Sequence, residues 1–378
     1  MNFKLTEDQL ILQKMVRDFT AHNIEPAADQ IEQTCKLHNN LIKELAGIGL
    51  LGMTVPKKYG GSEVTDLNCV LAIEQIAYSG TGAWWLVAFN NSIPHCIVRF
   101  GSEALKQQYL RPFCTGAAYA SIQFTEEDTG SDPVALTTSA IPAGNDYIIN
   151  GMKRFSTFGA RDGYAIVYAK DDTGDCTAFV VEKNCPGYSV EKTWQLMGSG
   201  GLEASDIYFQ DMRVPVTNIL GQKTKGFDIL LDWIALEKIQ QCGASIGIAQ
   251  AALDEAVNYA KARKSRGKPI SSMQGLKWMF AEMESKLSAA RWLTYRAAFL
   301  HDQNSADWQQ EAASAKLFVT RAALEVVEIA RQVHGCYGYT RDFKIERLYR
   351  AAAGATGIAT SLEINKSIVG NWVISRAE

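Results

Sequence analysis

Four short segments of this chain each combine glycine and hydroxyl residues with aromatic or basic ones, which are residue types that can contact a ligand. In one of them, Arg263 could form a bidentate, charge-assisted contact with a pyrophosphate. In another, Gly335 and Gly338 would let the backbone approach such a group closely. Each segment also has an ordinary interpretation: in chain order, a capped turn, an aromatic residue on a half-buried strand, a solvated basic loop and a packed structural histidine, His334. The segments are residues 124–132, 150–159, 263–274 and 332–340.

The sequence lacks the usual motifs of a Rossmann-type dinucleotide site and of a cysteine- and histidine-based metal site. No Gly-x-Gly-x-x-Gly follows a predicted strand, so a dinucleotide would need a cradle other than the Rossmann type. The eight cysteines are scattered, form no Cys-x-x-Cys pair and do not cluster with the five histidines. We therefore expect reduced, structural thiols and no metal site.

Length and composition indicate a globular protein of two or three domains. The chain has 378 residues, 47% of them hydrophobic and 21% charged, with a formal net charge of −3. Without a basic excess, nucleic acid is not expected as a partner. No apolar run reaches the roughly 18 residues that would cross a bilayer, and the first residues do not resemble a secretion signal. We expect a cytoplasmic protein with no membrane contact.

The hydrophobic periodicity changes twice along the chain and predicts three domains. Helical spacing predicts an N-terminal α-helical domain over 1–117, and alternating β-rich runs predict a middle antiparallel β domain over 118–222. Helical spacing then returns and predicts a C-terminal four-helix bundle over 223–378, giving an α+β fold. The expected strands lie near 118–124, 147–150, 164–169, 177–181 and 206–209, and the expected bundle helices near 227–264, 273–302, 306–335 and 355–376.

With the domains in this order, the four segments resemble motifs of the acyl-CoA dehydrogenase family. TEEDTGSD at 125–132 resembles the family's Thr-Glu-Pro-x-Ala-Gly-Ser-Asp loop. NGMKRFSTFG at 150–159 resembles Asn-Gly-x-Lys-x-Trp-Ile-Thr-Asn-Gly, with Phe155 in place of the tryptophan. RKSRGKPI at 263–270 resembles Arg-x-x-Phe-Gly-x-Pro-Ile, with Arg266 in place of the phenylalanine. QVHGCYGYT, which begins at Gln332, resembles Gln-x-His-Gly-Gly-x-Gly-Tyr.

The resemblance implies an FAD cofactor and suggests roles for individual residues. Groups near Thr125 would bind the flavin pyrimidine edge, Phe155 would cover one side of the isoalloxazine ring, and Thr157 would donate toward flavin N5. Ser131 lies where the family meets the flavin or the thioester ligand. The glycine segment would meet the cofactor of a neighbouring subunit, which implies an obligate oligomer, and the resemblance suggests a homotetramer built from the C-terminal bundles. The other expected FAD contacts are Arg263, Arg266, Gln274, Gln332, Gly335 and Ser361.

The catalytic base of the family is not at its most frequent position. Most members carry a carboxylate shortly before the final helix, where this chain has Ala359, which cannot take a proton. Members similar to isovaleryl- and long-chain acyl-CoA dehydrogenases instead place a glutamate in the first bundle helix, within Leu-Glu-Arg. This chain has Leu236-Glu237-Lys238 there, so the resemblance implies that Glu237 is the base. Read without the family, Glu237 would be an exposed helix residue paired with Lys238 or Gln241.

The function implied is an FAD-dependent acyl-thioester dehydrogenase that removes an α-proton through Glu237 while hydride passes from the β-carbon to flavin N5. The substrate would be a thioester of CoA or of an acyl carrier protein, held by Ser131, Lys238 and the backbone N–H of Ala359. Electrons would pass to an electron-transferring flavoprotein or a similar acceptor, or the reaction would run in reverse as an enoyl-thioester reductase. Two alternatives remain: a flavin-dependent monooxygenase of the same architecture, and a non-catalytic relative.

Overall fold

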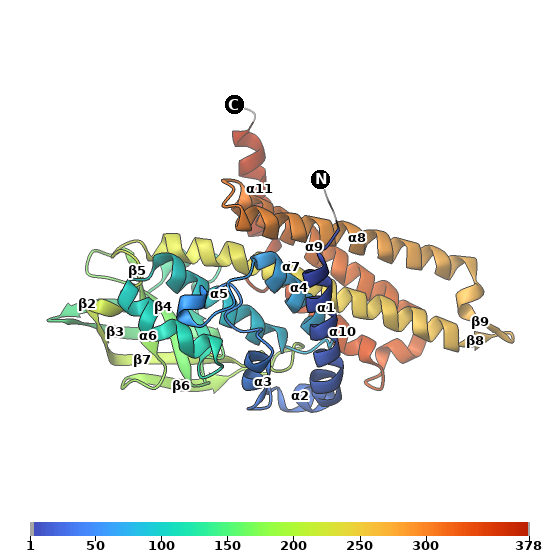
Figure 1. Ribbon diagram of the computed structural model, residues 1–378, viewed down its shortest axis with the longest axis horizontal. Coiled ribbons are helices and arrows are strands. Elements are labelled where there is room, and N and C mark those ends of the chain that lie inside the picture. Colours follow the sequence, from blue (N-terminus) through green and yellow to red (C-terminus); the bar gives the residue numbers. More distant parts are fainter. Residues whose placement is uncertain (1–3, 377–378) are drawn as a thin grey trace.

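The computed structural model describes residues 4–376, which form a helical region, a β-sheet and a bundle of long helices (Figure 1). The helical region comes first along the chain, and three of its helices, α1, α4 and α6, begin at polar caps. Thr6 and Gln9 form a reciprocal capping box, and the side chains of Thr65 and Ser102 accept hydrogen bonds from backbone N–H groups three residues on. The helices are α1 (Glu7–Phe19), α2 (Ala28–Thr34), α3 (Leu41–Gly47), α4 (Asp66–Ala77), α5 (Trp84–Phe100) and α6 (Glu103–Cys114).

The middle region folds into one seven-stranded mixed sheet. Its main path runs β1-β4-β2-β3-β7-β6, with β5 paired to the other edge of β4. All pairs are antiparallel except β1 with β4 and the single-residue contact of β2 with β4, which are parallel. The purely antiparallel pairing expected from the sequence is therefore corrected at these two pairs. The strands are β1 (Tyr119–Gln123), β2 (Ser139–Ala143), β3 (Asp146–Thr157), β4 (Gly163–Lys170), β5 (Cys176–Glu182), β6 (Tyr188–Thr193) and β7 (Ala204–Pro215).

The C-terminal region is built on α7 (Gly226–Ala262), which at 37 residues is about 55 Å long. The helices α8 (Gln274–Asp302) and α9 (Trp308–Val333) pack against it, and α10 (Lys344–Ala355) completes the bundle by packing on α7 and α9. The fourth helix expected at 355–376 is instead α11 (Leu362–Ser375), which contacts α9 and projects away from the bundle (Figure 1). A short hairpin, β8 (Lys264–Ser265) and β9 (Lys268–Pro269), joins α7 to α8.

The helix α7 lies at the centre of the molecule and joins the other parts. It packs against α4 and α5 from the first region and against α8, α9 and α10 from the bundle, so most of its residues are buried on every side. The strand β4 is also covered on both faces. In β4, Ile166 and Tyr168 join the main core, while Ala165, Val167 and Ala169 join a second apolar cluster on the other face.

Candidate functional site

Three polar or aromatic residues of α7 follow one another at helical spacing on one buried face. Trp233, Glu237 and Gln241 are four residues apart, so their side chains lie one above the other. All three are at most 3% exposed. The structure therefore rejects the alternative that Glu237 is an exposed helix residue. A carboxyl group this deeply buried requires a compensating partner or a functional reason.

The environment of Glu237 disfavours its charged form. Burial raises the pKa of Glu237 to about 7, although the ammonium groups of Lys316 and Lys238 act in the opposite direction. Its Oε2 atom is buried and has no hydrogen-bond partner among residues 4–376. A carboxyl group with a near-neutral pKa and a free oxygen is suited to take up and release a proton at physiological pH.

Lys316 of α9 is the second unusual group beside Glu237. Its side chain is fully buried, and burial lowers the pKa of Lys316 to about 8. The Nζ atom donates hydrogen bonds to Gln241 Oε1, at 2.6 Å, and to the backbone carbonyl of Ile358. Lys316 thus ties α7 to the loop that follows α10 and places a positive charge near the buried carboxyl group.

The loop held by Lys316 contains Ala359, the position at which the sequence resemblance places the most frequent base of the family. Ala359 has a left-handed backbone with φ of +68°, which is unusual for a residue with a Cβ atom. The neighbouring amide of Thr360 donates to Ile358 O at 3.0 Å. Ser361 caps α11 by accepting a hydrogen bond from the amide of Ile364. The structure therefore brings the Ala359 loop beside the Glu237 face of α7 through the shared Lys316.

An aromatic contact connects the sheet to the same stretch of α7. The ring of Phe124, which follows β1, lies 6.4 Å from the ring of Trp233, one helical turn before Glu237. The next residue, Thr125, accepts a backbone hydrogen bond from Arg154 at 2.8 Å. Glu126 then anchors the loop, because its carboxylate accepts from Lys153 Nζ at 2.7 Å and from the amides of the segment leading into β2.

Two of the expected flavin contacts lie on β3, next to that loop. A register shift in the pairing of β3 with β7 forms a bulge at Phe155, whose φ is +59°. The bulge turns the aromatic ring outward, so that Phe155 is 50% exposed and lies 5.3 Å from the ring of Trp194. Thr157 is buried at the end of the same strand, and its carbonyl accepts from Ser121. Ser131 is exposed on the loop after β1.

The remaining expected cofactor residues gather at the opposite end of the bundle. Figure 1 shows the β8–β9 hairpin at the end of the molecule farthest from the sheet. Arg263 directly precedes that hairpin, Arg266 lies in its turn, and Gln274 is the first residue of α8; all three residues are exposed. Stacking of His334 on Tyr259, with ring centroids 4.5 Å apart, holds the end of α9 against the end of α7. Gln332 and Gly335 are exposed beside it.

These residues fit FAD as two separate half-sites. At the sheet, a bulge presents an outward-facing aromatic ring, and the loop after β1 contacts the helix that carries a buried carboxyl group with an unpartnered oxygen. At the far end, two exposed guanidinium groups and Gly335, whose missing Cβ leaves open space, could receive a pyrophosphate. Since the two half-sites lie at opposite ends of one subunit, a single cofactor bound by both would have to join two copies of the chain.

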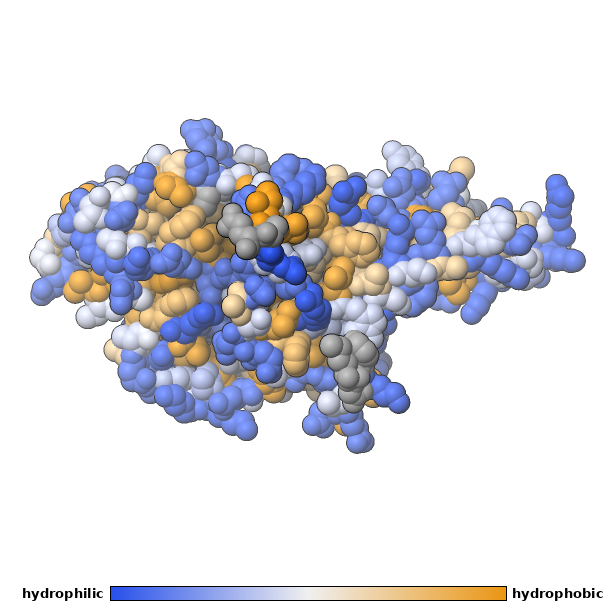
Figure 2. Space-filling view, turned by 90° about the horizontal axis from the view of Figure 1, so that it is seen from above, coloured by the Kyte–Doolittle hydropathy of each residue, from blue (hydrophilic) through white to orange (hydrophobic). Residues whose placement is uncertain are grey.

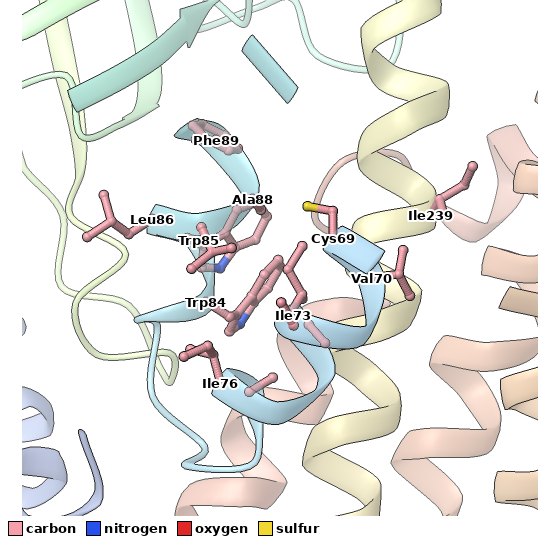
Figure 3. Packing of buried hydrophobic residues seen from close by; sticks show 14 of the residues in the cluster. Cys69, Val70, Ile73, Ile76, Trp84, Trp85, Leu86, Ala88, Phe89 and Ile239 are labelled. Atoms are coloured by element: carbon pink, nitrogen blue, oxygen red, sulfur yellow. The ribbon is translucent and has the colours of Figure 1, made fainter. Parts of the chain in front are cut away.

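Lys238 and the residues that line the cavity near Glu237 complete the site. Lys238 is 3% exposed, and burial lowers its pKa to about 8. A cavity lies one turn further along α7, beside Gln241, Ser245 and Ile358, and the first turn of α5 forms another wall with Trp84 and Trp85. Figure 3 shows the two tryptophans at this turn of α5, facing α4.

Sequence reasoning missed Lys316, Gln241 as a lysine partner and the two tryptophans. A signal for Lys316 was present, because this lysine interrupts an alanine-rich helix face, four residues after Ala312. Alanine and lysine both favour helices, so the pattern alone did not separate a buried lysine from a solvated one. The tryptophans begin an apolar helix and are typical of a core.

A second group of buried ionisable side chains lies apart from this site, where α4, α5 and α8 meet. Asp66 Oδ2 is 2.8 Å from His301 Nδ1, and one ring nitrogen of His95 is within 4.8 Å of both. Burial opposes the positive charge, but the hydrogen bond and charge of Asp66 raise the pKa of His301 overall. These groups form a buried ion pair, and the expected lack of a metal site stays a prediction.

Comparison with known proteins matches the whole architecture. Three family models cover the chain: acyl-CoA dehydrogenase N-terminal domain over 6–117, middle domain over 121–212 and C-terminal domain over 224–374. The chain is 37% identical to the 3-(aryl)acrylate reductase of Clostridium sporogenes, over 91% of this chain and 93% of that protein.

Two further similarities extend over almost the full length of the chain. It is 32% identical to the caffeyl-CoA reductase-Etf complex subunit CarC of Acetobacterium woodii, over 98% of this chain and 99% of that protein. The structure of butyryl-CoA dehydrogenase from Megasphaera elsdenii superimposes with a TM-score of 0.96 at 30% identity, covering 99% of this chain and 100% of that chain.

Proposed function

The chain belongs to the acyl-CoA dehydrogenase family, and on that basis we propose that it catalyses oxidation or reduction of the Cα–Cβ bond of an acyl thioester, with Glu237 as the proton-transferring group. The observation that supports this most is the buried, near-neutral carboxyl group of Glu237, whose Oε2 has no partner in the described part of the chain. Relatives of comparable identity are named as reductases, so the direction stays open.

In the oxidative direction, ionised Glu237 would take the proton from the α-carbon at its free Oε2 atom. FAD, when bound, supplies the acceptor for the hydride that leaves the β-carbon. The charge of Lys316 favours the ionised form of Glu237 and so increases the fraction of protein that is ready to act as base at neutral pH. In the reductive direction, protonated Glu237 would return its proton to the α-carbon.

We assign the binding of the thioester group to the loop that Lys316 holds. The backbone N–H of Ala359 would donate to the thioester carbonyl and stabilise the negative charge that develops there as the α-proton leaves. The left-handed backbone of Ala359 and the hydrogen bond from Lys316 to the preceding carbonyl support a fixed orientation of this loop. Ser131 and Lys238 remain proposed substrate contacts.

We propose that FAD binds across two subunits. Thr125, Phe155 and Thr157 would hold the flavin of one subunit, and the far bundle end of another would hold its pyrophosphate. The second group comprises Arg263, Arg266, Gln274, Gln332 and Gly335, with Ser361 as a further proposed contact.

Exposed apolar side chains support association of several copies, which we propose to be a homotetramer. Large hydrophobic residues on α8 and α11 are open to solvent: Trp278 is 66% exposed, Phe299 54% and Ile374 68%. Figure 2, seen from the side of α8 and α11, shows hydrophobic residues interspersed with hydrophilic ones, so the support comes from these individual large side chains and not from one continuous apolar patch. The similarity to a subunit named after an Etf complex supports an electron-transferring flavoprotein as redox partner.

Among residues 4–376, no helix is both long enough and apolar enough to cross a bilayer.

The test is anaerobic mixing of the purified flavin-loaded protein with acyl thioesters. Wild-type protein should lose its oxidised-flavin absorbance, whereas Glu237→Gln should keep bound flavin but bleach at least about 10³-fold more slowly, because its amide cannot accept the proton. Glu328→Gln, which makes the same change on the exposed face of α9, should bleach like the wild type. Full-rate bleaching by Glu237→Gln would remove this residue from the mechanism.

A further inference from the structure

Three side chains hold the end of β3, the strand that carries the proposed flavin contact Thr157. The three consecutive backbone carbonyls of residues 157–159 each accept a hydrogen bond of 2.8 Å from a side chain of another segment. Most hydrogen bonds in a sheet join backbone groups, so three successive side-chain anchors show that the sheet alone does not fix this path. The anchors are Ser121 Oγ on Thr157 O, Lys183 Nζ on Phe158 O and Tyr188 Oη on Gly159 O.

Two of these donors come from opposite ends of the sheet. The strands β1 and β6 are the first and the last on its main path, yet Gln123 Nε2 of β1 donates to Tyr188 Oη of β6 at 2.7 Å. A tyrosine hydroxyl has a single hydrogen, which Tyr188 donates to Gly159, so its oxygen is free to accept from Gln123. The side chains of both edges therefore meet at the end of β3 and fix one another there.

The third donor, Lys183, is an energetically costly anchor. It directly follows β5 and is 7% exposed, and burial lowers the pKa of Lys183 to about 7. Within the described part of the chain its ammonium group forms no ion pair, and its hydrogen bond goes to the carbonyl of Phe158. Burying an amino group with one carbonyl acceptor costs free energy, so packing alone does not favour this arrangement.

The backbone that these anchors hold is strained on both sides of Thr157. Phe155 has a φ of +59° and Phe158 a φ of +54°, a left-handed conformation that is unfavourable for an aromatic residue. Strain of this kind is concentrated at functional sites, where the surrounding structure maintains it. Because threonine is branched at Cβ, its side chain has few rotamers, and the backbone path largely sets where the Thr157 hydroxyl points.

We propose that Ser121, Lys183 and Tyr188 are positioning residues, which hold the backbone around Thr157 so that its hydroxyl points toward the flavin. The inference rests on the proposed function, because it deepens the proposed contact between Thr157 and FAD. The three anchors act through the backbone and do not touch the cofactor. Without one of them, the free protein would adopt other backbone paths at this point, and binding would have to restore the ordered path at a cost in affinity.

A double-mutant cycle on FAD affinity tests whether the anchors act through Thr157. The dissociation constant is measured by flavin fluorescence as the loaded protein is diluted. Ser121→Ala and Tyr188→Phe each remove one hydroxyl and little else, and each should weaken FAD binding by about 5- to 10-fold. Lys183→Met should weaken it at least as much. In a Thr157→Val background the same changes should weaken binding by less than about twofold, because the contact that they support is already lost.

Two matched controls make the same chemical changes at hydroxyls that anchor nothing. Ser156 and Tyr168 are buried, and their hydroxyl groups have no hydrogen-bond partner within residues 4–376. Ser156→Ala and Tyr168→Phe should therefore leave FAD affinity within about twofold of the wild type. Because Ser156 directly precedes Thr157, it also controls for a change that is merely close to the site. Unfolding temperature confirms that each variant is folded.

Two results would overturn the inference. Equal weakening by the anchor variants in the wild-type and Thr157→Val backgrounds would show that the anchors only stabilise the fold, and it would leave the proposed reaction intact. An unchanged FAD affinity in Thr157→Val would show that this hydroxyl is not a flavin contact. By contrast, coupling between the anchors and Thr157 in a protein whose flavin no acyl thioester bleaches would support the inference and count against the proposed reaction.

Discussion

Replacing Lys316 by methionine tests how the site controls its base. Methionine keeps most of the side-chain length but has no charge and no hydrogen-bond donor. Lys316 is the first of two cations that oppose the effect of burial on Glu237, so its removal should raise the pKa of Glu237 above its wild-type value of about 7. A base with a higher pKa is protonated over a wider range, and the rate should then rise only at more alkaline pH.

The size of the effect follows from the charge that is lost. Removing a nearby opposite charge changes a carboxyl pKa by roughly 1–3. With a wild-type pKa of about 7, half of the Glu237 side chains are ionised at pH 7. If the pKa rises by about 1–2, the ionised fraction at pH 7 falls to roughly 1–10%, so proton removal should slow by about 5- to 50-fold.

The assay is anaerobic stopped-flow of flavin bleaching as a function of pH. Lys316→Met should show a midpoint shifted to higher pH and should regain much of its rate at pH 9. The matched control is Lys286→Met, which removes a lysine that pairs with Glu325 at the surface of α8, and its midpoint should equal that of the wild type. If Lys316→Met lowers the rate at every pH without moving the midpoint, Lys316 acts only on the loop and on Gln241, and the electrostatic reasoning is refuted.

Two predictions concern stability. Glu126→Gln should lower the free energy of unfolding by about 3–5 kcal/mol in urea titrations, because the substitution leaves the fully buried Lys153 ammonium without its counter-charge. The control is the neighbouring Glu127→Gln, on a side chain that is 65% exposed, which should change the free energy of unfolding by less than about 1 kcal/mol. Equal losses in the two variants would contradict the account. Asp66→Asn should destabilise most near pH 6 and less at pH 9. The raised pKa of His301 means that its ion pair contributes fully below the unfolded pKa of 6.5 and is lost as pH rises through the folded pKa, so a loss that does not vary with pH would argue against this pair.

Much of the architecture was predictable because its periodicities are strong. The change from helical to alternating spacing and back identified the long helices, and four segments with family-like spacing led to the family. Strands β2 and β6 were missed for physical reasons. Pro142 weakens the strand pattern of β2, and β6 lies at the sheet edge with five of its six residues exposed, so it has no apolar alternation.

Pairings between distant segments were harder to predict. The parallel contact of β1 with β4 joins strands separated by a loop and two further strands, and hydrophobic pattern carries no information on such a partner. The contacts that build the candidate site also join distant segments and were equally hard to predict. Glu237 could be proposed from its local Leu-Glu-Lys context, but its burial depends on helices that come from both ends of the chain. Lys316 can be recognised as part of the site only from the packing of α9 against α7 and the Ile358 loop.

The most direct test of Glu237 as the proton-transferring group is exchange of the α-hydrogen of an acyl thioester in D₂O, followed by mass spectrometry on the flavin-loaded protein. The account predicts that the wild type exchanges this hydrogen with a half-maximal rate near pH 7, and that Glu237→Gln does not exchange it above the rate in buffer. Exchange by Glu237→Gln at the wild-type rate would contradict the account, because the proton would then be taken by another group.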